Sequence, residues 1–311
     1  MRAFLPLLLS LFLLLPLQAQ ETLRLYPDFV PTVQEEVEYD AQGLPVSYRK
    51  VTDPSVTVML PPAEKADGSA VLIFPGGALV SLSWDSEFRQ IASWLNARGV
   101  AAIGVKYRLR TSFSFPRPSG DRPDNKFLRM EGKIYDYPEL VKANTNPAIP
   151  DPSDHSMVNA ADDALAAMSL VLSHAAEWGI DPSRIGWMGF SAGGGVALAA
   201  LMEASPAQMP AFLCSVYGPS LVDVTVPENA PALYVAVHTD HPNVAAGCMA
   251  LFMEWKKAGA DAEIHVYDAV TGGFFGGPGA REQYHTPEGF WLESFYSWMR
   301  AHRFAMETTL E

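Results

Sequence analysis

The stretch RIGWMGFSAG, which runs from Arg184 to Gly193, carries the clearest structural signal in the chain. Its first part, Arg184–Phe190, has the apolar character of a buried strand, and the alanine-rich segment Ala192–Glu203 after it has that of a helix. Between them stands Gly-x-Ser-x-Gly, the pattern of a serine that is exposed on a sharp strand-to-helix turn. The stretch therefore predicts that Ser191 is a nucleophile at such a turn.

The residues on either side of Ser191 have a mechanical reason to be small. A serine on so sharp a turn is strained, and side chains at Gly189 and Gly193 would collide with the turn. The N–H of Ala192, at the start of the following helix, can face the negative charge that develops on a reacting oxygen. The alternative is a glycine-rich tight turn with an incidental serine, but the strand before it and the helix after it favour the nucleophile.

A second glycine-rich turn lies upstream, at Pro75-Gly76-Gly77-Ala78. It follows the apolar strand Ala70–Phe74 and precedes a helix expected over residues 85–98, which is where a second oxyanion donor is expected. Glycine lets the backbone approach a substrate oxygen with no Cβ in the way. We therefore predict that the N–H groups of Gly77 and Ala78 complete an oxyanion hole with that of Ala192.

Strands and helices alternate over most of the remaining chain. Further strands are expected over residues 100–107, 211–217, 232–238 and 262–267, and further helices over 157–178, 244–257 and 287–302. Continuous apolar strands separated by helices predict an α/β fold, with a mostly parallel central sheet and helices on both faces. Ligands bind at the carboxyl ends of the strands in such sheets, so the functional loops follow residues 74, 107, 190, 217, 238 and 267.

The first 20 residues differ in character from the rest. Arg2 precedes an apolar run from Leu5 to Leu17, and Ala19 offers a small residue for cleavage, a pattern that predicts a signal peptide and a secreted or periplasmic protein. The alternative is an uncleaved N-terminal anchor. Residues 21–311 would then form one domain, which a chain of this length can fold around a substantial core.

Two parts of this domain depart from the alternation. Residues 21–60 are rich in β-branched and aromatic residues, and they predict short antiparallel strands over 37–39, 46–51 and 56–60. Residues from about 109 to 156 are rich in Pro, Asn, Asp and Arg and form an insertion. A segment of this length is a lid, a binding surface or a solvated excursion, and the sequence leaves these alternatives open.

Composition excludes several classes of function. The net charge of −13 makes nucleic acid and anionic lipid poor partners, and no later segment is apolar enough to place the mature protein in a membrane. The seven histidines show no metal-ligand spacing, and we expect neither a metal nor another cofactor. Cys214 and Cys248 lie in apolar strand-like and helical segments, so we predict buried free thiols over a disulfide.

The chain resembles the secreted α/β-hydrolases that include acetyl-xylan and feruloyl esterases, the xylanase-associated esterases. The resemblance covers most of residues 23–303 outside the insertion. It implies the α/β-hydrolase fold, a Ser-acid-His triad and hydrolysis of small acyl esters, with carbohydrate esters among the substrates. Three segments carry it: Leu23–Pro27, Val58–Pro62 running into Phe74–Gly77, and Trp178–Gly186 leading to Ser191.

The sequence departs from this family at two catalytic positions. The family places its acid three residues before the position of Val244, where this chain has His241, and Asp240 stands one residue earlier. The family's histidine falls in a Gly-Gly-His segment, where this chain has Phe274. A one-residue shift of the loop would let Asp240 serve as the acid.

The general base must then be another histidine. His285 lies eleven residues after Phe274, beyond a Gly- and Pro-rich stretch, and we predict it as the base; His241 and His155 are the alternatives. Loss of the base would raise the barrier by roughly 5–8 kcal/mol. The first hypothesis is therefore an exported carboxylic-ester hydrolase acting on a small-molecule or carbohydrate ester. The second is a degenerate hydrolase that binds without cleaving.

Other residues have simpler explanations. His174, His238 and His265 are expected in a helix and in strands, where packing roles are typical. Asp162 and Asp163 are interpreted as offsetting a helix dipole. Trp84 either lines an acyl or sugar pocket or packs in the core, and the sequence does not separate the two.

Overall fold

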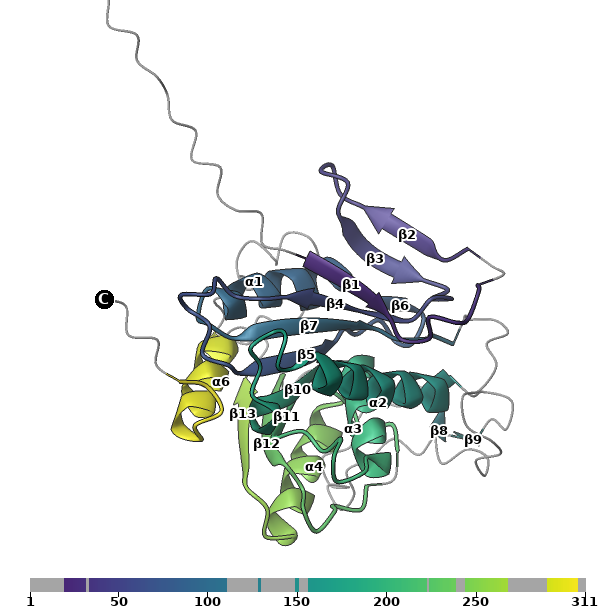
Figure 1. Ribbon diagram of the computed structural model, residues 1–311. Coiled ribbons are helices and arrows are strands. Elements are labelled where there is room, and N and C mark those ends of the chain that lie inside the picture. The colour runs from purple at the N-terminus through teal and green to yellow at the C-terminus, as the bar shows by residue number, and fades with distance from the viewer. Residues whose placement is uncertain are drawn as a thin grey trace, which may run out of the picture.

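The computed structural model describes residues 20–31, 34–110, 128–129, 149–150, 156–222, 224–238, 244–267 and 290–306. Its centre is an eight-stranded sheet in the order β1-β4-β7-β5-β10-β11-β12-β13 (Figure 1). The strands are β1 (Gln20–Arg24), β4 (Ser55–Met59), β5 (Ala70–Phe74), β7 (Ala101–Lys106), β10 (Ile185–Phe190), β11 (Phe212–Val216), β12 (Ala232–His238) and β13 (Ala262–Tyr267).

The direction of the strands separates the sheet into two parts. β4 runs antiparallel to both β1 and β7, whereas all pairs from β7 to β13 are parallel. The chain passes from β5 outward to β7 and then back past β5 to β10. The strand order thus reverses between β5 and β10, and crevices for ligands open at the carboxyl ends of the strands at such a switch point.

Helices cover both faces of this sheet (Figure 1). On one face, α1 packs against α6 through Trp94 and Tyr296, whose rings meet edge to face at 5.8 Å. α2, α3 and α4 cover the other face, as right-handed crossovers between parallel strands require. The helices are α1 (Gln90–Asn96), which continues the π-helical turn η1 (Asp85–Arg89), α2 (Ser156–His174), α3 (Ala192–Glu203), α4 (Ala245–Lys257) and α6 (Phe290–Ala301); the 3₁₀ turn η3 (Pro182–Arg184) precedes β10.

Two small sheets accompany the central one. β2 (Glu36–Tyr39) and β3 (Pro45–Arg49) form an antiparallel hairpin, and β6 (Ser81–Leu82) pairs with β3. The hairpin stands away from the central sheet in Figure 1. Two-residue strands also pair within the predicted insertion, β8 (Leu128–Arg129) with β9 (Ile149–Pro150). The other residues of the insertion from 111 to 155 lie outside the described residues, so its predicted role is untested.

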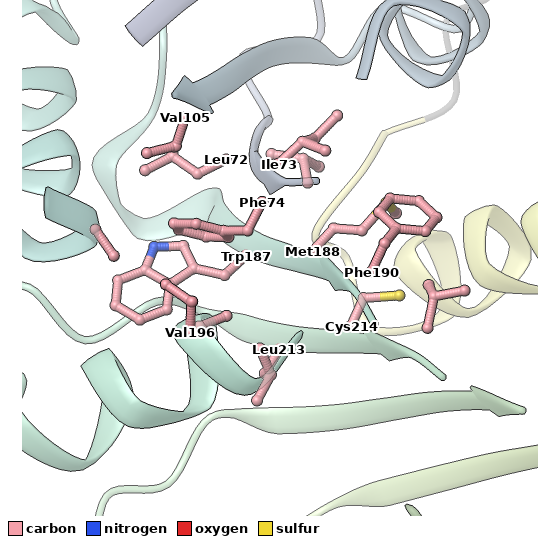
Figure 2. Close-up of a cluster of buried hydrophobic side chains, with 14 of the residues drawn as sticks. Leu72, Ile73, Phe74, Val105, Trp187, Met188, Phe190, Val196, Leu213 and Cys214 are labelled. Carbon is pink, nitrogen blue, oxygen red and sulfur yellow. The ribbon is translucent and has the colours of Figure 1, made fainter. Parts of the chain in front are cut away.

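The hydrophobic core lies on both faces of the sheet, because successive side chains of a strand point to opposite faces. Phe74 and Trp187 point to the face covered by α3, where their rings meet at 5.7 Å beside Val196 (Figure 2). Met188 and Phe190 point to the opposite face, and Phe190 contacts Trp291 of α6 at 5.8 Å. The central strands are therefore buried on both sides, which accounts for their continuous apolar sequence.

A buried ion pair corrects one prediction from the sequence. Asp163 does not offset a helix dipole at the surface: its side chain is fully buried and lies 2.6 Å from the guanidinium of Arg108, which is 1% exposed. The same carboxylate accepts hydrogen bonds from the N–H of Arg108 and the hydroxyl of Tyr26. The pair thus ties the end of β7 and the N-terminal segment to α2.

The predicted architecture is confirmed by this arrangement. Both cysteines are buried free thiols, as expected. Every helix within the described part of the chain is too short or too polar to cross a bilayer. The first 19 residues, predicted to be a signal peptide, lie outside the described residues.

Candidate active site

Ser191 occupies the turn between β10 and α3, as the sequence predicted. Its backbone has φ of 49° and ψ of −125°, which is strained for any residue with a Cβ. A serine before a helix commonly caps it with its hydroxyl, but among the described residues Ser191 makes no such bond to α3. Capping of α3 therefore does not account for a serine at this position.

The predicted crowding around the elbow is confirmed by the packing. A Cβ on Gly189 would lie 2.5 Å from the Cα of Gly194, and one on Gly193 would lie 2.1 Å from the carbonyl oxygen of Phe74. Both distances are below any real carbon contact, and both involve backbone atoms that cannot rotate away. The elbow therefore fits against its own helix and against β5 only with glycine at these two positions.

The register of the sheet brings the second glycine-rich turn beside the elbow. Gly189 pairs with Phe74 in the ladder, so the residues that follow each of them leave the sheet side by side. A Cβ on Gly76 would lie only 2.9 Å from the Cβ of Ser191. The turn Pro75–Ala78, which is predicted to hold oxyanion donors and is called the oxyanion loop below, is thus directly adjacent to Ser191.

The oxyanion loop has an unusual backbone. φ is +139° at Gly77, +55° at Ala78 and +59° at Leu79, so three successive residues have left-handed φ values. A turn of this kind can collect successive N–H groups into a concave, anion-binding surface. The loop is held closed because the carbonyl oxygen of Gly77 accepts from the N–H groups of Val80 and Ser81.

Helix α3 supplies the third predicted donor. Ala192 is its first residue, and the N–H groups of the first turn of a helix have no partner within the helix. The positive end of the helix dipole lies at the same place. Ala192 thus stands next to Ser191 in the chain, while the oxyanion loop stands next to it in space.

Two further residues of the site were not predicted from the sequence. Glu87 of η1 accepts a hydrogen bond from the N–H of Gly76 through Oε2 at 2.6 Å. Its other oxygen, Oε1, accepts from the hydroxyl of Tyr217 at 2.9 Å. An acid in the first turn of a helix is ordinarily interpreted as offsetting the dipole, so the sequence held no separate signal for this role.

The predicted acid and base lie outside the described residues. This applies to Asp240, His285, Phe274 and the alternatives His241 and His155. β12 ends at His238 and β13 at Tyr267, and the carboxyl ends of these strands lie at the same edge of the sheet as Ser191. The described part of the site therefore lies in the turns that begin at Pro75, Ser191 and Tyr217, directly after β5, β10 and β11.

The remaining candidate histidines and Trp84 have structural contacts. His174 bonds the carbonyl oxygen of Leu170 and stacks on Trp178 within its own helix end. His265 pairs with Glu263 and stacks on Tyr234. His238 is buried at the end of β12.

Trp84 belongs to the hydrophobic core. It is 1% exposed and packs against Tyr48 and Phe88, at ring distances of 5.2 and 4.6 Å. Of the two interpretations left open by the sequence, the structure supports packing.

Comparison with known proteins bears on the fold. A family described as alpha/beta hydrolase fold matches residues 152–267, the segment that contains Ser191. No curated protein sequence matches the chain significantly.

Solved structures share the fold at low sequence identity. The acetyl ester-xyloside bifunctional hydrolase of Caldicellulosiruptor lactoaceticus is 19% identical with a TM-score of 0.54, over 82% of this chain and 90% of that one. The carboxylesterase Cest-2923 of Lactobacillus plantarum WCFS1 is 14% identical with a TM-score of 0.56, over 88% and 99%. Esterase 2 of Thermogutta terrifontis, solved phosphoramylated by tabun, is 19% identical with a TM-score of 0.54, over 90% and 98%. The chain has the α/β-hydrolase fold.

Proposed function

We propose that this chain is an exported serine hydrolase that cleaves carboxylic esters of small acyl groups, including esters on carbohydrate. The observation that carries the proposal is Ser191, held on a strained strand-to-helix turn between the oxyanion loop and the N-terminus of α3. Backbone donors placed in advance around a nucleophile are what acyl transfer requires. The sharing of the fold with esterases is consistent with this reaction, although fold alone does not assign it.

The reaction proceeds in two halves. The hydroxyl oxygen of Ser191 attacks the ester carbonyl while a histidine takes its proton, and the carbonyl oxygen becomes an oxyanion. The N–H groups of Gly77, Ala78 and Ala192 donate to that oxyanion. Collapse of the intermediate expels the alcohol, which leaves with the proton, and water then hydrolyses the acyl-enzyme by the same route. No cofactor is needed for either half.

We assign the base to His285 and the acid that orients it to Asp240. The assignment rests on chain order, since Asp240 follows β12 and His285 follows β13, and both strands end at the edge of the sheet that carries Ser191. The order Ser-Asp-His along the chain is also that of α/β-hydrolases. His241 and His155 are the competing bases.

The proposal of export rests on the sequence alone. The N-terminal apolar segment supports a cleaved signal peptide, which would place the mature enzyme outside the cytoplasm. N-terminal sequencing of the purified native protein tests the cleavage: a mature chain that begins near residue 20 supports a cleaved signal peptide, and one that begins at Met1 contradicts it.

Turnover of p-nitrophenyl acetate by the purified protein tests the hydrolase. We expect wild-type activity and a loss of at least about 10³-fold in kcat for Ser191→Ala. Ser205→Ala, at an exposed serine beyond α3, is the matched control and retains activity. A fluorophosphonate probe should label Ser191 alone. Equal rates for wild type and Ser191→Ala, or absence of both turnover and labelling, would defeat the proposal and leave the binding-only hypothesis.

A further inference from the structure

We infer that Glu87 and Tyr217 are positioning residues that together hold the oxyanion loop in its donating geometry. This inference rests on the proposed function, because it assigns the two side chains a role in the same oxyanion site. Neither residue follows from the nucleophile pattern or from the glycine-rich turn.

The first contact fixes which donors the loop can offer. The N–H of Gly76 points to Glu87 Oε2 at 2.6 Å, a short charge-assisted hydrogen bond. Since that N–H is used by Glu87, the donor role passes to the next residues of the loop, Gly77 and Ala78. The carboxylate therefore anchors the first turn of the loop and sets the direction of the N–H groups that follow.

The second contact extends the anchor across the site. Tyr217 immediately follows β11, and its N–H still continues the ladder to Ala236 at 2.7 Å. Its φ of 41° is strained for a residue with a side chain, and its hydroxyl reaches Glu87 Oε1 at 2.9 Å. β11 and β5 lie on either side of β10, so this bridge joins elements from both sides of Ser191.

The bridge uses both oxygens of the carboxylate. Glu87 accepts on both oxygens, from the N–H of Gly76 and the O–H of Tyr217. A glutamine offers one neutral oxygen and one NH₂ group, so it would accept from the Gly76 N–H without a charge and would have to donate to the Tyr217 oxygen, which reverses that hydrogen bond. The oxyanion loop has a second hydrogen bond, in which the buried Tyr107 donates its hydroxyl to the carbonyl oxygen of Pro75. A substitution at Glu87 leaves that hydrogen bond in place.

A direct role for the negative charge is excluded by its sign. A carboxylate beside an oxyanion opposes the charge that develops in the transition state, so Glu87 does not stabilise it by charge. Its contribution is to the position of the donors, and displacement of preorganised donors lowers kcat more than it weakens substrate binding.

Kinetics of three variants test the inference. Glu87→Gln replaces the charged acceptor of the bridge with a neutral amide, Tyr217→Phe removes the hydroxyl at its other end, and Asp85→Asn is the matched control. Asp85 lies in the same helical turn as Glu87, and Asp85→Asn removes the same charge. The carboxylate of Asp85, however, bonds Arg89 and Gln90 instead of the loop. With p-nitrophenyl acetate, we expect Glu87→Gln to lower kcat about 10- to 100-fold with KM changed less than twofold, and Asp85→Asn to match the wild type.

An inhibitor that forms an oxyanion adds a readout that loss of stability would not move. A trifluoromethyl ketone forms a hemiketal with Ser191, so its Ki should rise in Glu87→Gln by the same factor as kcat/KM falls. Tyr217→Phe should act in the same direction, and the double variant should be no worse than Glu87→Gln, because the two side chains act as one unit. Equal losses in Asp85→Asn and Glu87→Gln, or additive losses in the double variant, would overturn the inference.

A spectroscopic measurement separates this inference from the proposed function. With glycine-selective ¹⁵N labelling, the amide proton of Gly76 should appear far downfield in the wild type and move upfield in Glu87→Gln. The Gly76 signal should not move in Asp85→Asn. Absence of ester turnover by the wild type counts against the proposed function, whereas an unmoved Gly76 signal in Glu87→Gln counts against the bridge.

Discussion

Gly76 and Ser191 approach so closely that no side chain fits between them. A Cβ on Gly76 would meet the Cβ of Ser191 at 2.9 Å and the carbonyl oxygen of Phe190 at 2.7 Å. The nucleophile and the oxyanion loop are therefore one packed unit, although they are more than one hundred residues apart in sequence. The geometry of either one depends on the other.

Gly76→Ala should consequently displace the loop from the elbow. We expect kcat/KM for p-nitrophenyl acetate to fall about 100-fold or more, because the oxyanion donors move from their positions. Gly179→Ala is the control: Gly179 has φ of +66°, but a Cβ there meets nothing within 4 Å. It should lower stability by about 1–2 kcal/mol without changing kcat. Equal activity of Gly76→Ala and the wild type would contradict the close packing.

The buried pair of Arg108 and Asp163 predicts a large effect on stability. Asp163→Asn leaves the guanidinium buried without its counter-charge, so the free energy of unfolding should fall by about 3–5 kcal/mol in urea denaturation. Asp162→Asn makes the same change one residue away, at a partly exposed position, and should cost much less. The double variant Arg108→Met/Asp163→Leu should be more stable than Asp163→Asn, because it removes both charges together. A double variant less stable than the single one would argue against this account.

Cys248 predicts the sign of an alkaline pH dependence. Burial raises the pKa of its thiol to about 12, whereas the unfolded chain titrates near 9.0. Between these values the unfolded state has lost the proton and the folded state has kept it, so the group destabilises the fold as pH rises from 9 to 12. Cys248→Ala should therefore flatten the fall in unfolding free energy by about 1.4 kcal/mol per pH unit in this window. Unchanged slopes would mean that the thiol is not protected in the native state.

The proposed base can be tested by removing His285 and, separately, by introducing a histidine at position 274. His285→Ala should reduce kcat about as strongly as Ser191→Ala, because residues that act as a unit lose activity together. Phe274→His places an imidazole at the Gly-Gly-His position that the sequence resemblance implies, and we expect little gain if His285 already serves. His174→Ala, at a histidine that bonds its own helix, is the control. A gain of several powers of ten in Phe274→His would show instead that the natural chain lacks its base.

The parts of the fold that sequence predicts are those that local pattern determines. The helix over Ala192–Glu203 and the strand over Ala232–His238 have the bounds that periodicity indicates, since each is a continuous apolar run between clear stop signals. The two-residue strand β6 was not predicted, because so short a segment has no period. Its pairing with β3 depends on tertiary contacts.

The candidate site divides in the same way. The positions of Ser191, Gly77 and Ala78 are predictable, because each has a backbone conformation that a short sequence motif indicates. Glu87 and Tyr217 are not, because their role lies in a contact between segments 130 residues apart. Asp163 was misassigned for a related reason: its position near the start of a helix is visible in the sequence, but the guanidinium of Arg108 beside it is not.

The strained backbone around the nucleophile has an evolutionary consequence. Of the six non-glycine residues with positive φ in the described part of the chain, four stand at this edge of the sheet: Ala78, Leu79, Ser191 and Tyr217. Leu79 and Tyr217 are buried, so glycine there would lose more packing than the strain it releases. Ala78 and Ser191 are not buried, so a laboratory selection for heat resistance alone should enrich glycine at these two positions. Such lineages would survive higher temperatures as progressively poorer catalysts, and the two traits would separate at these two codons first.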